Sequence, residues 1–183
     1  MLNKRLSEIV IVSSLVFLII VICLRKQDII KDLFAKKESS LFQLNDNFPV
    51  PEIEVISLQG FKEKLSFIDN REKSLIFIID ISCAPCEKNI AIGERLYQQI
   101  KGSAEVIGIV KGEIHQAAAL KEAFKVQFPL YIPLDVGKFS KIFYTGPLDL
   151  TLLVTENGKI GWAKIGDLNA DDYLNLKNLI LKN

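Results

Sequence analysis

The chain is poor in the residues that build metal centres and disulfide frameworks. Its 183 residues include one histidine and three cysteines. A structural zinc site would need a second cysteine or histidine pair, which the chain does not offer. Three cysteines also cannot form the set of bridges that holds small secreted domains together. A net charge of +1 gives no sign of the basic stripe typical of nucleic-acid-binding proteins. We therefore expect no metal, no cofactor and no nucleic acid.

Charged residues are missing from one segment, residues 9–24, in which only Ser13 and Ser14 are polar. The run is slightly shorter than the usual ~20 residues of a membrane-spanning helix. Flanking arginine and lysine side chains can extend its reach by snorkelling. A cleaved signal peptide or a lipoprotein signal is the alternative. No small-residue cleavage site follows the run, and Ile22 is bulky for a lipidation site at Cys23. We expect residues 1–26 to be an uncleaved transmembrane anchor and residues 27–44 a juxtamembrane linker.

The most informative stretch is an apolar run, residues 75–79, that leads into two cysteines. The run predicts a strand buried on both faces. Cys83 and Cys86 follow with two residues between them, and Pro85 stands where a helix can begin without losing a hydrogen bond. A cysteine at a helix N-terminus has a lowered pKa, and its thiolate is a nucleophile. The pattern predicts a reactive dithiol in which Cys83 attacks and Cys86 resolves.

Strand, Cys-x-x-Cys and helix within an alternating α/β pattern resemble the thioredoxin superfamily, and most closely its membrane-tethered TlpA/ResA-like branch, including MauD-like members. The resemblance covers roughly residues 44–183. It implies a thioredoxin fold at residues 45–183, with a central mixed β-sheet flanked by helices and an N-terminal β-hairpin. It also implies substrate contacts at Ala84 and Pro85.

The remaining periodicity supplies the elements of such a fold. Residues 157–158, Asn-Gly, signal a tight hairpin between two strands. Asn169 or Asp171 can cap the last helix. The expected strands are 52–58, 61–67, 75–79, 105–110, 150–155 and 159–165, and the expected helices are 87–101, 114–126 and 171–182. The resemblance also implies a short extended segment at residues 129–135, followed by a small helix at residues 138–144.

The chain departs from its relatives at the positions that handle protons. The aromatic residue that usually precedes the first cysteine is Ser82. Two positions that hold carboxylates in relatives hold Phe77 and Asn89. Asp80 is the acid just upstream of the motif. It is either a solvated strand end or the catalytic base that takes the proton of Cys86.

Relatives also have a cis-proline that faces the disulfide, and this chain has a different residue at the matching position. Counting from the hairpin places it at Asp149, and counting from Gly146 places it at Leu148. Pro147 is one or two residues early. We expect Pro147, Leu148 and Asp149 to form this substrate-contacting segment.

His115 is the one histidine, and we expect it on the surface. A copper-ligating role, as in Sco-like chaperones, is the alternative. Those proteins have three residues between the cysteines and a histidine much later in the fold, and both features are missing here.

The resemblance implies a membrane-anchored thiol–disulfide oxidoreductase that exchanges disulfides with extracytoplasmic proteins. The positive-inside rule would instead put the domain in the cytoplasm, because more lysines and arginines follow the span than precede it. We follow the resemblance and expect a single-pass membrane protein whose domain faces the periplasmic side. The alternative function is a tethered interaction or assembly module whose cysteines sense redox state or hold a metal transiently.

Overall fold

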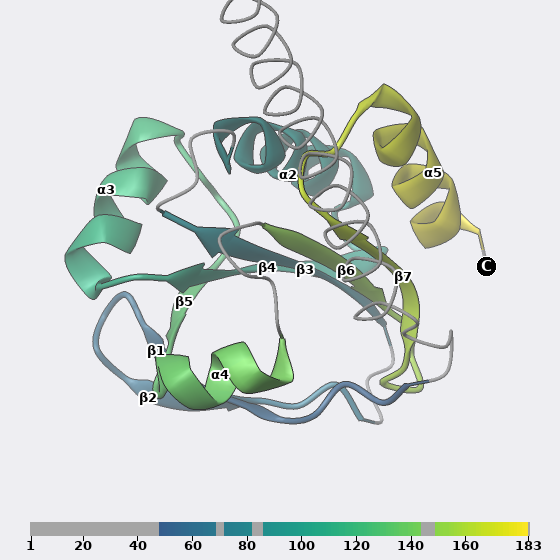
Figure 1. Cartoon of the computed structure of the whole chain (residues 1–183). Coiled ribbons are helices and arrows are strands. Elements are labelled where there is room, and N and C mark those ends of the chain that lie inside the picture. Colours follow the sequence, from purple (N-terminus) through teal and green to yellow (C-terminus); the bar gives the residue numbers. More distant parts are fainter. Residues whose placement is uncertain (1–47, 69–71, 82–85, 144–148, 183) are drawn as a thin grey trace, which may run out of the picture. The chain divides into compact units, whose positions relative to one another are not determined.

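The computed structural model describes residues 48–68, 72–81, 86–143 and 149–182, and Figure 1 shows the chain. The chain divides into two units, Met1–Gln43 and Leu44–Asn183. The predicted anchor, residues 1–26, and the predicted linker, residues 27–44, lie outside the described residues. Within the described residues, no helix has the length and apolar character needed to cross a membrane.

A seven-stranded mixed sheet forms the centre of the described domain, in the order β2-β1-β5-β4-β3-β6-β7. Strand β3 runs parallel to β4, and β4 runs parallel to β5. The other neighbouring strands are antiparallel. The strands are β1 (Ile53–Ser57), β2 (Lys62–Leu65), β3 (Lys73–Asp80), β4 (Ala104–Lys111), β5 (Leu130–Pro133), β6 (Leu150–Val154) and β7 (Ile160–Ile165).

Helices cover both faces of the sheet. Figure 1 shows α2 and α5 on one side of the strands and α4 on the other. A single apolar cluster joins the sheet to α2, α3 and α5, so α3 shares the face of α2 and α5. The bounds of the helices are α2 (Cys86–Ile100), α3 (Ile114–Ala123), α4 (Val136–Ile142) and α5 (Ala170–Leu181).

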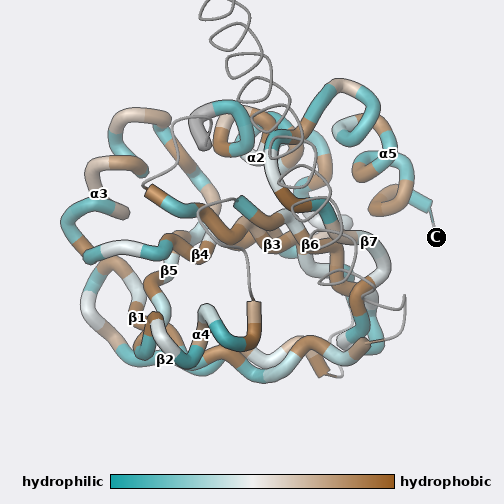
Figure 2. Tube along the Cα trace, viewed as in Figure 1, coloured by the Kyte–Doolittle hydropathy of each residue, from teal (hydrophilic) through white to brown (hydrophobic). Residues whose placement is uncertain are grey.

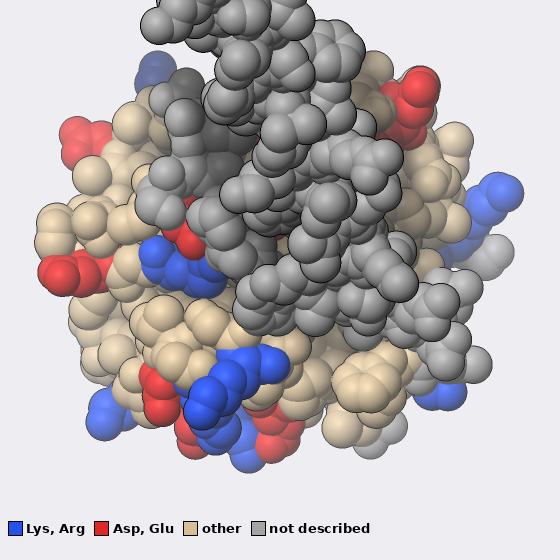
Figure 3. Space-filling view, in the orientation of Figure 1, with Lys and Arg blue, Asp and Glu red and all other residues tan. Residues whose placement is uncertain are grey.

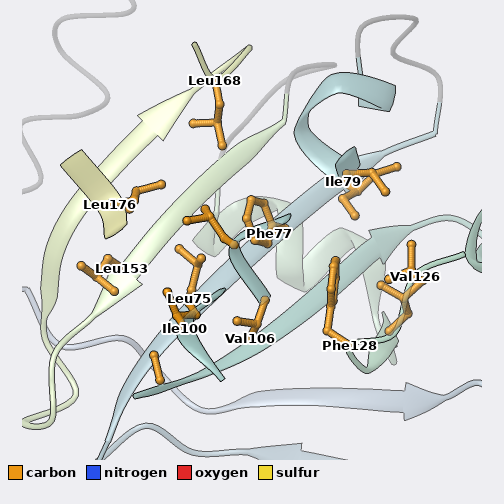
Figure 4. Packing of buried hydrophobic residues seen from close by; sticks show 14 of the residues in the cluster. Leu75, Phe77, Ile79, Ile100, Val106, Val126, Phe128, Leu153, Leu168 and Leu176 are labelled. Atoms are coloured by element: carbon orange, nitrogen blue, oxygen red, sulfur yellow. The ribbon is translucent and has the colours of Figure 1, made fainter. Parts of the chain in front are cut away.

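The central strand β3 is buried along its whole length except at its two ends. Its odd-numbered residues Leu75, Phe77 and Ile79 point into the cluster under α2 and α5, as Figure 4 shows, and its even-numbered Ile76 and Ile78 belong to the opposite face. Each such side chain contributes about 1.5–3 kcal/mol when it is fully buried. In Figure 2 the central strands are mostly hydrophobic, whereas hydrophobic and hydrophilic residues alternate along the helices.

The predicted elements are largely confirmed, including the N-terminal hairpin of β1 and β2. Helix α2 stops at Ile100, and Gly102 takes the left-handed backbone with φ 87° that commonly ends a helix. Of the two candidate caps of α5, Asn169 is the one used, since its side chain accepts from the backbone N–H groups of Asp171 and Asp172.

Two predictions need correction. The extended segment at residues 129–135 is confirmed, but it contains a strand, Leu130–Pro133 (β5), that is missing from the predicted strands and that lies between β1 and β4. Helix α3 ends at Ala123, earlier than the predicted residue 126. Lys125 adopts a left-handed backbone with φ 52°, which turns the chain so that Val126 and Phe128 enter the core.

Candidate functional site

The Cys-x-x-Cys motif connects the middle of the sheet to the first turn of a helix. Strand β3 lies between β4 and β6 and ends at Asp80, and α2 begins at Cys86. Cys83, Ala84 and Pro85 lie outside the described residues, as do Pro147 and Leu148. The roles predicted for them stay predictions, whereas the residues on either side of the motif are described in detail.

Asp80 is not a solvated strand end. Its carboxylate Oδ2 lies 2.8 Å from Lys111 Nζ, and the two side chains are only 15% and 8% exposed. The parallel register places Asp80 beside Lys111, so the last residues of β3 and β4 face each other as an ion pair. The predicted role of Asp80 as a catalytic base stays a prediction, and any such role has to accommodate this lysine.

Asp149 is a buried acid at the start of β6, with 3% of its surface exposed. Its Oδ1 accepts a hydrogen bond from the backbone N–H of Asp80 at 3.0 Å. Its Oδ2 accepts from Asn89 Nδ2, also at 3.0 Å. The side chain therefore points into the protein, towards the ends of β3 and α2. This orientation favours an internal role over a side-chain contact with a substrate.

Asn89 is a second buried polar residue, 1% exposed, three residues after the start of α2. Besides Asp149, its Nδ2 donates to the carbonyl oxygen of Gly166 at 3.0 Å, and its Oδ1 accepts from the backbone N–H of Leu168 at 2.8 Å. All the donors and acceptors needed to hold its amide are thus provided by neighbouring backbone and by Asp149. Asn89 fixes the first turn of α2 to the loop that follows β7.

The loop after β7 completes this arrangement through Gly166. Its backbone N–H donates to the carbonyl oxygen of Asp149 at 2.8 Å, and its φ of 86° is a backbone conformation that favours glycine. Hydrogen bonds therefore join four segments next to the motif: the end of β3, the first turn of α2, the residue before β6 and the loop after β7.

An apolar rim adjoins the motif on the side of β4. Ile81, the residue after β3, is 37% exposed and lies against Gly112. A Cβ atom at position 112 would come within 2.7 Å of Ile81 Cδ1. Ile114, at the start of α3, is 39% exposed. The described surface beside the motif thus combines apolar side chains with a shielded ion pair.

The charged groups farther out are ordinary surface residues. Lys88 and Asp167 lie 3.7 Å apart, with side chains 72% and 43% exposed, and such pairs contribute little to stability. Figure 3 shows acidic and basic side chains interspersed on the visible face of the described residues.

His115 is on the surface, as predicted, with its side chain 73% exposed and beside Glu113. Among the residues that the structure describes, no group of three histidine, cysteine or acidic side chains could hold a metal ion.

Sequence reasoning missed Lys111 as a neighbour of the motif and the link between Asn89 and Asp149. The signal for Lys111 was available, because a lysine that ends a buried parallel strand lies level with Asp80 once β3 and β4 are aligned. Nothing local marks the contact between Asn89 and Asp149, which are 60 residues apart.

Comparison with solved structures identifies this architecture. A thiol:disulfide interchange protein from Bacteroides sp. superposes with a TM-score of 0.66 and 18% identity, covering 76% of this chain and 92% of that one. The thioredoxin domain of a thiol-disulfide oxidoreductase from Bacteroides vulgatus superposes with a TM-score of 0.65 and 19% identity. The match covers 75% of this chain and 99% of that one. StoA from Bacillus subtilis superposes with a TM-score of 0.56 and 18% identity. The match covers 72% of this chain and 97% of that one.

No family model matches the sequence, and no curated protein matches it. The similarity is therefore one of three-dimensional structure at low sequence identity. The superposed part covers about three quarters of this chain and nearly the whole of these solved proteins. The described part of the chain has the thioredoxin fold.

Proposed function

We propose that the chain is a membrane-anchored thiol–disulfide oxidoreductase that acts on extracytoplasmic proteins through Cys83 and Cys86. The observation that carries the proposal is the position of the motif. It lies between the carboxyl end of the central strand β3 and the first residue of α2 in a thioredoxin fold. The structural neighbours named above include thiol:disulfide interchange proteins, which supports the same chemistry.

The reaction is a pair of thiol–disulfide exchanges. The Cys83 thiolate attacks one sulfur of a partner disulfide, a mixed disulfide forms, and the other partner sulfur leaves as a thiolate. Cys86 loses its proton and attacks the Cys83 sulfur, which releases the second partner sulfur. The partner disulfide gains two electrons and ends as two thiols, and the dithiol of this chain becomes a disulfide. The reverse sequence oxidises a partner dithiol.

The remaining predicted residues have supporting roles in this proposal. Ala84 and Pro85 lie between the two cysteines, and Pro147 and Leu148 precede Asp149 in the chain. They would contact the partner polypeptide around its disulfide. Residues 1–26 would hold the domain at the membrane, where a membrane or extracytoplasmic redox partner restores the dithiol.

The test is insulin reduction by the purified full-length chain, with dithiothreitol as the electron donor. We expect catalysis by the natural sequence and a return to the uncatalysed rate with Cys83→Ser. Cys86→Ser should accumulate mixed disulfides, which can be isolated from cells to identify the partner. Equal rates for the natural sequence and Cys83→Ser would contradict the proposal and favour the tethered interaction module.

A further inference from the structure

The chain enters the described domain at the end of the sheet that lies opposite the Cys-x-x-Cys motif. Phe48 is the first described residue, and its carbonyl oxygen accepts a hydrogen bond from the N–H of Ile160 at the start of β7. Ile160 pairs with Val154, which pairs with Ser74 near the first residue of β3. The motif follows the last residue of β3. Figure 1 shows β3 ending at the left and the turn between β6 and β7 at the right.

Two large apolar side chains flank this turn. The carbonyl oxygen of Gly158, in the turn, accepts from the N–H of Val50, two residues after Phe48. A Cβ atom at position 158 would come within 3.1 Å of Ile68 Cα. Phe48 and Ile68 are each 56% exposed. Exposed apolar residues that gather in one place mark interaction sites, whereas single ones are ordinary.

The end of α5 brings a third exposed apolar side chain to the same end of the sheet. Lys73, the first residue of β3, donates from Nζ to the carbonyl oxygens of Leu179 at 3.0 Å and of Lys182 at 2.7 Å. Leu181 lies between these two residues in the chain and is 46% exposed. We call Phe48, Ile68 and Leu181 the entry surface.

Charged side chains of both signs surround the entry surface. Exposed residues at this end of the sheet include Lys101 after α2, Lys159 and Glu156 between β6 and β7, Glu72 before β3 and Lys182 after α5. Because both signs are present, net charge does not select an acidic or a basic partner. Apolar side chains with lysines around them are typical of protein surfaces that lie at the boundary between lipid and water.

The chain that leads into the entry surface makes a bilayer its nearest partner. Residues 1–47 precede Phe48, and residues 1–26 carry the predicted anchor. A tether turns the second contact into an intramolecular one, so a weak contact is well populated at the high effective concentration. Three apolar side chains are few for a stable protein interface, which takes about 20–30 residues on each side. A tethered contact with lipid needs far fewer.

We propose that the entry surface contacts the headgroup region of the bilayer and holds the domain with its dithiol motif facing away from the membrane. This inference rests on the membrane anchoring in the proposed function. The eight residues of β3 span about 25 Å at roughly 3.3 Å per residue. The motif then meets disulfides of extracytoplasmic proteins that lie up to that far from the bilayer, and not thiols at the level of the headgroups.

The experiment measures how close each end of the domain lies to lipid. A full-length variant with serine in place of its three cysteines is inserted into phosphatidylcholine nanodiscs. Single cysteines then carry a nitrobenzoxadiazole fluorophore: Ile68→Cys and Leu181→Cys at the entry surface, and Ile114→Cys beside the motif. Side chains at a bilayer interface lie about 5–10 Å deep, so nitroxide lipids should quench the two entry-surface labels at least about twofold more than the label at 114.

Substitution tests whether the apolar side chains cause this orientation. A label on Asn157→Cys, in the turn between β6 and β7, reports on this end of the sheet while the entry surface stays intact. The triple variant Phe48→Ser/Ile68→Ser/Leu181→Ser should lower the quenching of this label to the level seen at position 114. Urea unfolding of the unlabelled triple variant shows that it is folded.

A matched variant removes three other exposed apolar side chains from the same domain. Leu134, Val136 and Ile142, on α4 and just before it, are 39%, 45% and 44% exposed. Leu134→Ser/Val136→Ser/Ile142→Ser should leave the quenching of the label at position 157 unchanged. An equal loss in the two triple variants would contradict a specific role of the entry surface.

Further outcomes would overturn the inference. One is quenching at position 114 that equals or exceeds quenching at 68 and 181. Another is a folded entry-surface variant that stays fully quenched. A label at 68 that brightens without quenching by lipid would assign the surface to a protein partner, such as a second copy of the chain. A chain that elutes apart from the nanodiscs lacks the anchor, and this failure of the proposed function is seen before any quenching is measured.

Discussion

Lys111 Nζ lies 2.8 Å from Asp80 Oδ2, and this ion pair joins the last residues of the parallel strands β3 and β4 beside the dithiol motif. Both side chains are largely shielded from water, at 8% and 15% exposure. Removing charges from water is costly, and their attraction offsets that cost only while both partners are present. The pair therefore holds together the carboxyl ends of β3 and β4, where the chain leaves β3 and continues into the motif.

Breaking this pair on one side should destabilise the protein. We expect Lys111→Met to lower the free energy of unfolding by roughly 3 kcal/mol, because it removes the positive charge that faces the shielded Asp80 carboxylate. The double variant Asp80→Leu/Lys111→Met should recover most of the loss. Urea unfolding, followed by the fluorescence of the single tryptophan, Trp162, measures both. A loss below about 1 kcal/mol for Lys111→Met would place the pair with ordinary surface ion pairs.

Cys83 should be the more reactive cysteine. It precedes α2, whereas Cys86 is the first residue of that helix. Exposed N–H groups at a helix N-terminus stabilise a thiolate, so the apparent pKa of Cys83 should be below the ~8.5 of a free thiol. The rate of iodoacetamide labelling against pH, in the reduced Cys23→Ser chain, gives this value, with Cys83→Ser as the control. Preferential labelling of Cys86 would reverse the roles of the two cysteines.

The first 26 residues should hold the chain in a membrane with its domain outside the cytoplasm. The basis is the uncharged run at residues 9–24. A reporter enzyme that is active only outside the cytoplasm, fused after Asn183, should be active, and deletion of residues 1–26 should abolish its activity. Activity of a cytoplasm-only reporter at the same site would show that the lysines after the span decide the orientation.

A side chain at Gly108, in the middle of β4, should destabilise the protein. A Cβ atom there would overlap Leu130 Cδ2 and would come within 3.1 Å of Phe128 Cε2. Overpacking of this kind costs about 1–3 kcal/mol, so Gly108→Ala should lower the urea midpoint accordingly. Leu130→Val shortens the closest neighbour, and the double variant should be more stable than the sum of the single changes implies. Strict additivity would mean that the two positions do not contact each other.

Local patterns in the sequence were enough for most of the elements. The apolar run at residues 75–79 predicted a central strand because a strand buried on both faces shows no alternation. Cys86 was placed in the first turn of a helix because Pro85 stands where a helix can begin. Asn157-Gly158 predicted the last hairpin, and Gly158 has the expected positive φ of 71°. These features depend on residues within a few positions of one another.

The arrangement beside the motif was decided by the tertiary structure. Asp80 meets Lys111 only because β3 and β4 align in parallel, and Asn89 meets Asp149 only because β6 pairs with β3 beneath the first turn of α2. The insertion of β5 between β1 and β4 is likewise a matter of strand order. The hydrophobic period of each helix or strand, and the turn that ends it, depend on residues that are close together in the sequence. Which polar groups face one another across 60 residues depends on how all the elements pack into one core.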